Sequence, residues 1–120
     1  MLNLDTHILV ALVTGDVGDE EYRCVVDQRL AVSGIVFWEL AKLIQKRRLM
    51  MDLDGSDFRA WVRNLTVFPI TLEIARKSTQ LDFSSDPADE IIAATSIVEK
   101  VPLLTRDQRI RRSRMVPLAL

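Results

Sequence analysis

The sequence predicts an α/β fold with a mostly parallel central sheet of four to five strands. Short apolar runs alternate along the chain with longer segments whose apolar residues recur at helical spacing. Polar or glycine-containing turns separate these segments, and no repeat, linker or low-complexity stretch interrupts the 120 residues. Strands that alternate with helices in this way form a parallel sheet. A chain of this length is expected to form a single domain over residues 1–120.

The first half of the chain contains two predicted strands and three predicted helices. Thr6 can cap the first helix, because a threonine hydroxyl accepts hydrogen bonds from free backbone N–H groups. The apolar side of the second helix carries Tyr22, Val25, Val26 and Leu30, and that of the third carries Val36, Leu40, Leu43 and Ile44. The expected elements are a strand over 1–5, helices over 7–13 and 19–29, a strand over 31–34 and a helix over 35–48.

The second half is expected to continue the alternation and to end at a sheet edge. Thr71 can cap one helix, and Asp86 followed by Pro87 is typical of the start of another. The expected elements are a short helix over 57–64, a strand over 65–70, helices over 71–80 and 87–100, a strand over 101–105 and a last strand over 115–118. Pro117 would confine that last strand to an edge, because proline has no N–H to donate.

Composition excludes several classes of protein. Hydrophobic residues make up 48% and charged residues 28% of the chain, which excludes a disordered tail. The 16 basic and 17 acidic residues nearly balance, so net charge gives no indication of a nucleic-acid partner. Cys24 is the only cysteine and cannot form an internal disulfide, which favours a reducing compartment. The apolar run 8–13 is too short to span a membrane and lacks a preceding basic region, so we expect a cytoplasmic protein without membrane association.

Four carboxylates stand at predicted strand ends or helix starts, namely Asp5, Glu39, Asp89 and Asp107. Such ends meet at one edge of a parallel sheet, where ligands bind. Four acids in one crevice repel one another unless a cation holds them, and an oxygen-rich site suits Mg²⁺ or Mn²⁺. Hydrolysis of a phosphodiester is the reaction that such a site supports best.

Each carboxylate also has a purely structural interpretation. Asp5 could cap a helix, although Thr6 alone can do so and leave Asp5 free to face the crevice. Glu39 could be an exposed residue favoured by the helix dipole, but its apolar neighbours indicate a boundary position. Asp89 is a good third residue for the helix that Asp86 starts, and Asp107 suits a turn.

Four segments together resemble the motifs of PIN-domain nucleases, and most closely the VapC-type toxins of bacterial toxin–antitoxin pairs. These segments are Leu4-Asp5-Thr6-His7, Trp38-Glu39-Leu40, the run from Asp86 to Thr95, and Leu104-Thr105-Arg106-Asp107. The resemblance covers the whole chain in order, and the step of 18 residues from Asp89 to Asp107 also matches.

The resemblance implies a three-layer α/β/α PIN-like fold and an RNA-cleaving site. Asp5, Glu39, Asp89 and Asp107 would hold one or two Mg²⁺ or Mn²⁺ ions, while Thr6, Asp86 and Thr105 would orient the carboxylates. It also implies a homodimer and inhibition by a small cognate antitoxin protein. Two positions depart from the family pattern, since Ala88 replaces a frequent aromatic residue and Glu90 a frequent basic one.

Basic residues follow the fourth predicted strand closely and could contact RNA phosphates: Arg106, Arg109, Arg111, Arg112 and Arg114. They could equally form a solvated face. Lys42, Lys46, Arg47 and Arg48 allow the same two interpretations.

Other residues with possible functions have simpler interpretations. We expect His7 to be structural. We expect Trp38, Phe58 and Trp61 to pack in the core or in a dimer interface rather than to stack on bases. The loop from Asp52 to Asp57 resembles a calcium loop, but Arg63 occupies the twelfth position, where such a loop needs Glu.

Two alternatives to a nuclease remain open. A phosphoacceptor signalling domain has a similar length and an acidic Mg²⁺ pocket. It would need paired acids after the first strand and an acid after the third, yet Asp5 is unpaired and the segment Pro69-Ile70-Thr71 has no acid. A catalytically silent PIN-like module that only binds RNA or a partner is the other alternative, and its distinguishing property is the absence of cleavage.

Overall fold

The computed structural model describes residues 1–120 and has a four-stranded sheet at its centre. The strands are β1 (Leu2–Leu4), β2 (Leu30–Ser33), β3 (Thr66–Phe68) and β4 (Leu103–Leu104). They lie in the order β3-β2-β1-β4, and every neighbouring pair is parallel. The predicted α/β fold is confirmed, and the sheet is wholly parallel.

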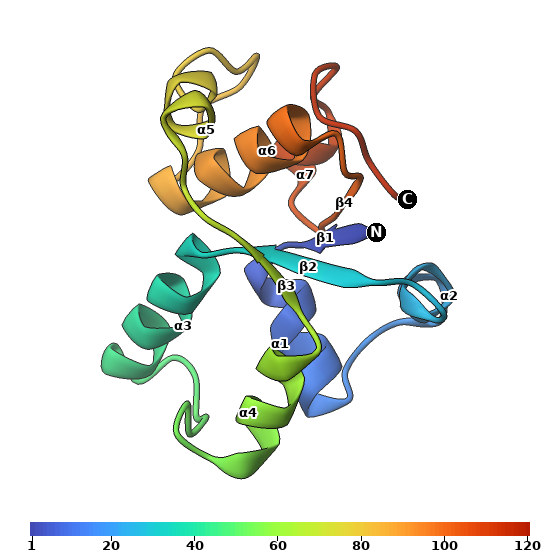
Figure 1. Cartoon of the computed structure of the whole chain (residues 1–120), viewed down its shortest axis with the longest axis vertical. Helices are drawn as coiled ribbons and strands as arrows, with labels where there is room; N and C mark the ends of the chain where they lie inside the picture. The colour runs from blue at the N-terminus through green and yellow to red at the C-terminus, as the bar shows by residue number, and fades with distance from the viewer.

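Helices cover both faces of the sheet (Figure 1). On one face lie α1 (Thr6–Thr14), α3 (Ile35–Gln45) and α4 (Ser56–Arg63). On the other lie α5 (Leu72–Lys77), α6 (Pro87–Glu99) and α7 (Gln108–Arg111). The helix α2 (Asp19–Val25) lies near the end of the sheet where β2 begins. No helix is both long enough and apolar enough to cross a membrane.

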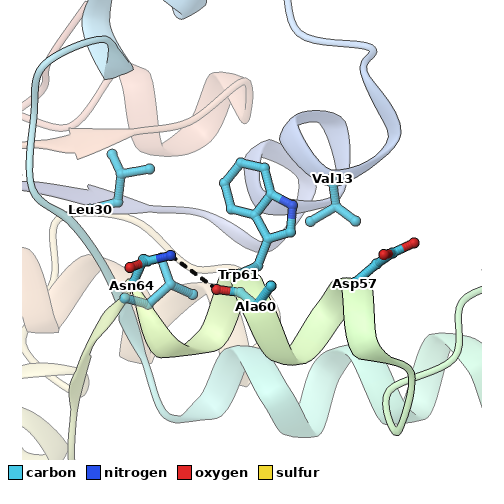
Figure 2. Close-up of a pocket in the computed structure, with 7 residues that line it drawn as sticks. Val13, Leu30, Asp57, Ala60, Trp61 and Asn64 are labelled. Atoms are coloured by element: carbon cyan, nitrogen blue, oxygen red, sulfur yellow. Dashed lines mark hydrogen bonds between the residues drawn. The ribbon is translucent and has the colours of Figure 1, made fainter.

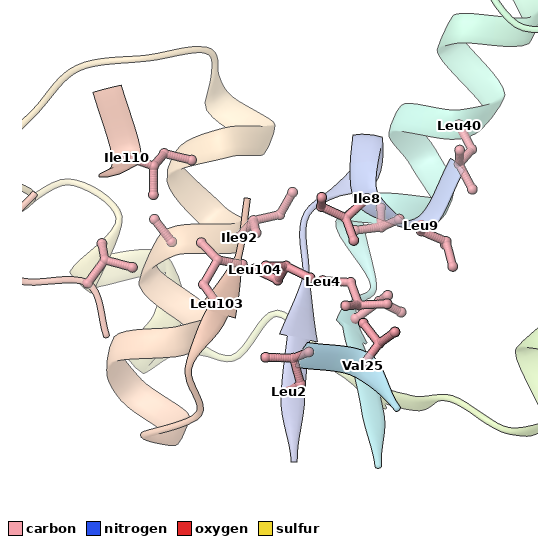
Figure 3. Packing of buried hydrophobic residues seen from close by; sticks show 14 of the residues in the cluster. Leu2, Leu4, Ile8, Leu9, Val25, Leu40, Ile92, Leu103, Leu104 and Ile110 are labelled. Atoms are coloured by element: carbon pink, nitrogen blue, oxygen red, sulfur yellow. The ribbon is translucent and has the colours of Figure 1, made fainter. Parts of the chain in front are cut away.

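The core forms where β1 lies between the two helical layers. Figure 3 shows buried side chains on both sides of this strand, among them Ile92, Leu103 and Ile110 on one side and Ile8, Leu9 and Leu40 on the other. Burial of this apolar surface is the main source of the free energy that keeps the layers together.

Asn3 is a buried polar residue in the middle of β1. Its side-chain amide donates to the Ser96 hydroxyl at 2.9 Å and to the carbonyl oxygen of Ile92 at 3.4 Å, both on α6. Because successive side chains of a strand point to opposite faces, Leu2 and Leu4 face the layer of α1 instead. The strand is thus polar toward α6 and apolar toward α1.

Two helices end earlier than the sequence predicts. The helix α2 ends at Val25 rather than at residue 29, and Tyr22 and Val26 are 56% and 45% exposed rather than in the core. The helix α3 ends at Gln45 rather than at residue 48. In each case a residue with positive φ follows within two positions, Asp27 at 61° and Arg47 at 58°. A left-handed backbone cannot continue a right-handed helix.

The C-terminal segment differs from the prediction in two ways. The last strand is reduced to a single parallel bridge between Leu103 and Leu118, supported by a 2.8 Å hydrogen bond from Leu103 N–H to the oxygen of Pro117. The short helix α7 was not predicted from the sequence. It begins after Asp107, whose carboxylate accepts from the N–H groups of Arg109 and Ile110.

Candidate metal centre

Three of the four candidate carboxylates meet at the C-terminal end of β1. Asp5, Glu39 and Asp89 each offer an oxygen, and these three atoms lie within 4.8 Å of one another. Asp5 follows β1, while Glu39 and Asp89 lie near the starts of α3 and α6. Figure 1 shows that α3 and α6 begin near each other from opposite faces of the sheet. This convergence is the one expected at the carboxyl edge of a parallel sheet.

Asp5 is only 2% exposed, and both of its carboxylate oxygens are hydrogen-bonded. Oδ1 accepts from the backbone N–H of Thr6 at 2.8 Å, and Oδ2 accepts from the Thr105 hydroxyl at 2.6 Å. Burial raises the pKa of the Asp5 carboxyl, and these two hydrogen bonds oppose the rise. The side chain is therefore held in one orientation.

The expectation that Thr6 caps α1 and leaves Asp5 free is wrong. Asp5 is the N-cap of α1, and its side chain accepts from the Thr6 N–H. The Thr6 hydroxyl donates instead to Oε1 of Glu39. The exchange has a physical reason, because a carboxylate acceptor makes a stronger hydrogen bond than a neutral one.

Glu39 and Asp89 are both half-buried, which agrees with the boundary position predicted for Glu39. Asp89 accepts a 3.0 Å hydrogen bond from the Ser85 hydroxyl. Burial, together with the charges of Asp5, Glu39 and Asp107, raises the pKa of Asp89 to about 6, although the Ser85 hydrogen bond opposes this. The folded chain therefore carries electrostatic repulsion at this point.

Asp107 lies near this group but is not part of it. Its Oδ1 accepts from the backbone N–H of Arg109 at 2.8 Å and of Ile110 at 3.3 Å, and thereby caps α7. Its own N–H donates to the Thr105 hydroxyl at 3.0 Å. Its charge nevertheless contributes to the raised pKa of Asp5 and of Asp89. Asp107 thus caps α7 and also lies close enough to the three acids for its charge to affect them.

The donor set fits a divalent cation. Three carboxylates supply oxygen ligands, which Mg²⁺ and Mn²⁺ prefer over nitrogen or sulfur. A cation among them would offset the burial and the repulsion that together raise the pKa of Asp89. The hydroxyls of Thr6, Ser85 and Thr105 already fix the orientation of the carboxylates, as supporting residues do in metal sites.

The residues around α6 differ in their contacts. Ser85 holds Asp89 and was missed in the sequence, where its signal is a hydroxyl four residues before the acid. Glu90 accepts from the Ser85 N–H at 3.3 Å, so its carboxylate binds the loop before α6. Asp86 is exposed at the N-cap position, and its side chain makes no hydrogen bond there.

The arginines after β4 divide into two groups. Arg106 donates to both carboxylate oxygens of Glu21, at 2.7 and 2.8 Å, and to the carbonyl oxygen of Asp16 at 3.0 Å. These bonds from Arg106 lower the pKa of Glu21 to about 2. Arg111 donates to the Thr105 carbonyl oxygen at 3.3 Å. By contrast, Arg109 and Arg112 are exposed and line a cavity of about 270 Å³.

One sizeable cavity lies away from the acids. It has a volume of about 530 Å³, and its lining residues include Val13, Leu30, Asp57, Trp61 and Asn64. Figure 2 shows the Trp61 side chain projecting from α4 toward the side on which Val13 and Leu30 lie. Asp57 is its only carboxylate, so it offers no cluster for metal or acid–base chemistry. The chemistry of the side chains therefore favours the acids, and not this cavity, as the functional site.

Comparison with known proteins identifies relatives of this chain. The family model of the PIN domain matches residues 3–114. Ribonuclease VapC22 from Mycobacterium tuberculosis is 33% identical over 91 residues, which cover 71% of this chain and 68% of that protein.

Solved structures show the same fold at lower sequence identity. VapBC2 from Rickettsia felis, bound to a DNA fragment from its promoter, matches with a TM-score of 0.75 at 20% identity, over 98% of this chain and 97% of the other. A toxin–antitoxin complex from Klebsiella pneumoniae matches with a TM-score of 0.71 at 19% identity, over 100% and 98% of the two chains.

Proposed function

Because the chain belongs to the PIN-domain family and is of the VapC type, we propose that it is a metal-dependent endoribonuclease, the toxin of a type II toxin–antitoxin pair. The observation that carries this proposal is the meeting of Asp5, Glu39 and Asp89 within 4.8 Å at the carboxyl edge of the sheet. The relative named as a ribonuclease supports RNA as the substrate.

In this proposal Asp5, Glu39 and Asp89 hold Mg²⁺ or Mn²⁺, and Asp107 completes the acidic group from its rim. Such ions, when bound, lower the pKa of a water nucleophile and offset the negative charge that develops on the phosphate. The protein supplies no side-chain nucleophile. Cys24 lies on α2, outside the acidic group, and the exposed His7 lies in a cavity beside Asp107.

The protein's own contribution is to orient the carboxylates, with hydrogen bonds that at Asp5 and Asp89 also oppose the rise in pKa caused by burial. Thr105 and the Thr6 N–H act on Asp5, and the Thr6 hydroxyl acts on Glu39. Ser85 acts on Asp89. Hydrogen bonds to a carboxylate favour its charged form, which is the form that binds a cation. Asp86 is exposed at the entrance to the acids, where its charge would attract cations.

The proposed partners are a small cognate antitoxin and a second copy of the chain. The antitoxin is supported by the relatives solved as toxin–antitoxin complexes. The homodimer is supported by exposed apolar side chains near the edge strand β3, with Leu72 at 75% and Ile70 at 45% exposure. The RNA substrate and the lone Cys24 favour the cytoplasm.

The test is RNA cleavage by the purified protein, with mapping of the cut ends. We expect cleavage of mixed cellular RNAs in Mg²⁺ or Mn²⁺ and none in EDTA. Asp5→Asn, purified in the same way, controls for contaminating nucleases. Cleavage that persists in EDTA would contradict the metal site. RNA binding without cleavage would instead indicate the catalytically silent module.

A further inference from the structure

A second open cavity, of about 480 Å³, lies beside the acids. We call it the α3–α6 cavity, because its lining comes from α3, the segment that follows it and the start of α6. The lining residues are Trp38, Glu39, Lys42, Leu43, Lys46, Arg48, Asp86, Pro87 and Ala88. Glu39 belongs both to this cavity and to the group of three acids. A ligand in the α3–α6 cavity would therefore lie directly against the proposed metal centre.

Three cations line the α3–α6 cavity, and none has an acidic partner. They are Lys42, Lys46 and Arg48, whereas the one ion pair in residues 1–120 joins Arg106 to Glu21. Lys42 donates only to the neutral side-chain oxygen of Gln45, at 3.3 Å. Unpaired cations can bind the phosphates of a nucleic-acid backbone. Because these cations lie next to the acids, a strand bound by them could be cleaved at the acids.

Trp38 lines the same cavity and is 52% exposed, so it does not pack in the core of this chain as one of the interpretations of the sequence had it. An exposed indole ring offers a flat apolar surface on which a nucleobase can stack. Trp38, Lys42 and Lys46 are spaced at i, i+4 and i+8, so they share one face of α3 and its C-terminal cap. The Lys42 ammonium lies 5.8 Å from the centre of the Trp38 ring. The face thus offers an aromatic ring with a positive charge over one side of it.

From this arrangement we propose that the α3–α6 cavity binds single-stranded RNA next to the cleavage site, with a nucleobase stacked on Trp38 and phosphates bound by Lys42, Lys46 and Arg48. The inference rests on the proposed ribonuclease function and adds the path of its substrate. An unpaired strand is required, because a base can reach the indole ring only when it is free of its own stack. In this proposal Trp38 and the three cations of the α3–α6 cavity select unpaired RNA.

Binding without cleavage tests the proposal. A labelled unpaired RNA oligonucleotide is titrated in EDTA, and its fluorescence anisotropy is followed. Trp38→Ala should weaken binding by about five- to a hundredfold, the range for the loss of one stacked base, while Trp38→Phe should retain most of the affinity. RNA affinity falls as salt rises, and the slope of log K against log salt is therefore negative. The triple change Lys42→Ala, Lys46→Ala, Arg48→Ala should make this slope less steep by roughly 2, about 0.7 for each lost phosphate contact.

A matched triple change, Arg59→Ala, Arg63→Ala, Lys77→Ala, removes the same charge from α4 and α5 and should leave the salt slope at the wild-type value. Fluorescence gives a second measurement that needs no variant of the cavity. In a Trp61→Phe background Trp38 is the only tryptophan, and RNA should quench the tryptophan emission because the base covers the ring.

The outcomes separate the two proposals. If the wild type cleaves RNA in Mg²⁺, but the cavity variants bind RNA as the wild type does and Trp38 emission does not change, the proposed RNA path is wrong while the ribonuclease function stands. If the wild type neither binds nor cleaves RNA, the proposed function itself fails. If the cavity variants retain RNA binding but lose the co-expressed antitoxin, the surface serves a protein partner and the RNA path is again overturned.

Discussion

The hydroxyl of Thr105 donates a 2.6 Å hydrogen bond to Oδ2 of Asp5. The two residues are 100 positions apart in the chain and follow neighbouring strands, β4 and β1. The same hydroxyl oxygen accepts from the Asp107 N–H at 3.0 Å. One buried threonine thus connects the most buried acid of the candidate metal centre to the segment that carries Asp107.

Thr105→Val is expected to impair the metal centre without changing its carboxylates. Valine keeps the shape of threonine and removes the donor, so Asp5 is less well oriented and its charged form is less favoured. We expect a loss of about 10- to 100-fold in cleavage or in metal affinity. The unfolding free energy should also fall by roughly 1–3 kcal/mol, because a buried acceptor loses its donor.

The measurements are cleavage rates across a Mg²⁺ titration and denaturant unfolding. Thr14→Val is the control, because its hydroxyl bonds to a backbone carbonyl of the exposed end of α1. Equal Mg²⁺ dependence in both variants would show that Thr105 does not support the site.

Neutral isosteres of the three acids should abolish cleavage and toxicity. Asp5→Asn, Glu39→Gln and Asp89→Asn each remove a charge from the group that would hold the cation. Expression of the wild type alone should slow growth, co-expression of the cognate antitoxin should relieve it, and the three variants should be tolerated. Growth curves and RNA cleavage by the purified proteins check this. Equal tolerance of wild type and Asp5→Asn would exclude a toxin role.

The stability of the metal-free protein should fall as pH rises through the titration of Asp89. The pKa of this carboxyl is about 6 in the folded chain, against an ordinary value of 3.8, so the folded state binds the proton more tightly. The contribution is fully present below pH 4 and is lost as pH rises through 6. Asp5, whose pKa is also raised, acts in the same direction. Asp89→Asn should remove about 1–2 kcal/mol of this pH dependence, a value that allows for solvent screening of a half-exposed group.

Thermal melts in EDTA between pH 4 and 8 measure this difference. Addition of Mg²⁺ at pH 7 should then stabilise the wild type by about 2.7 kcal/mol at a hundred times its dissociation constant, and Asp89→Asn by much less. Asp54→Asn, in an exposed loop, removes the same charge elsewhere and should behave as the wild type does. A variant at Asp89 that gains as much from Mg²⁺ as the wild type would reduce Asp89 to a helix-start residue.

Arg106 is expected to stabilise the fold and not to bind RNA. Its guanidinium is committed to Glu21, so Arg106→Ala should leave the RNA affinity unchanged. At pH 7 the unfolding free energy should fall by no more than about 1 kcal/mol. Because the pKa of Glu21 is lowered to about 2, the contribution of the pair is present above pH 4.5 and is lost as pH falls toward 2.

The exposed pair Arg109 and Arg112 provides the comparison. Their joint change to Ala should weaken RNA binding and reduce the salt slope by roughly 1.4. Binding in EDTA at several salt concentrations measures both variants. An affinity loss in Arg106→Ala as large as that in the double variant would contradict the division of the arginines into two groups.

The local features of the fold were predictable from the sequence, because they depend on near neighbours. Apolar runs predicted all four strands, and Thr71 and Asp86 predicted the starts of α5 and α6. The ends of α2 and α3 were not predictable in this way. They depend on left-handed backbone at Asp27 and Arg47, and positive φ is uncommon at any residue other than glycine, although aspartate adopts it more often than arginine.

Features set by distant residues were missed. Nothing near Thr6 indicates that its hydroxyl is taken by Glu39, 33 positions away, and that Asp5 therefore caps α1. In the sequence nothing distinguishes Arg106 from its neighbouring arginines, because its partner Glu21 lies 85 positions away. The meeting of four acids was predicted from parallel topology, which brings strand ends and helix starts to one edge, and three of the four meet there. The capping role of Asp107 depends on α7, which is too short to give a periodic signal.

The buried contact of Asn3 with α6 fixes how far that helix can slide along the sheet. Asn3 and Asp5 are two residues apart on one face of the chain, a span of about 6.6 Å in extended backbone. Asn3 donates to Ile92 and to Ser96, so it contacts α6 midway between these two residues. That point is five residues beyond Asp89, a span of about 7.5 Å along a helix. The near match of the two spans brings Asp89 level with Asp5. A leucine at position 3 could pack against α6 as favourably but would not specify its axial position. Substitution of Asn3 could therefore leave the stability of the fold unchanged while it alters the relative positions of Asp5 and Asp89. Stability and the geometry of the acids would then be under separate selection in this protein.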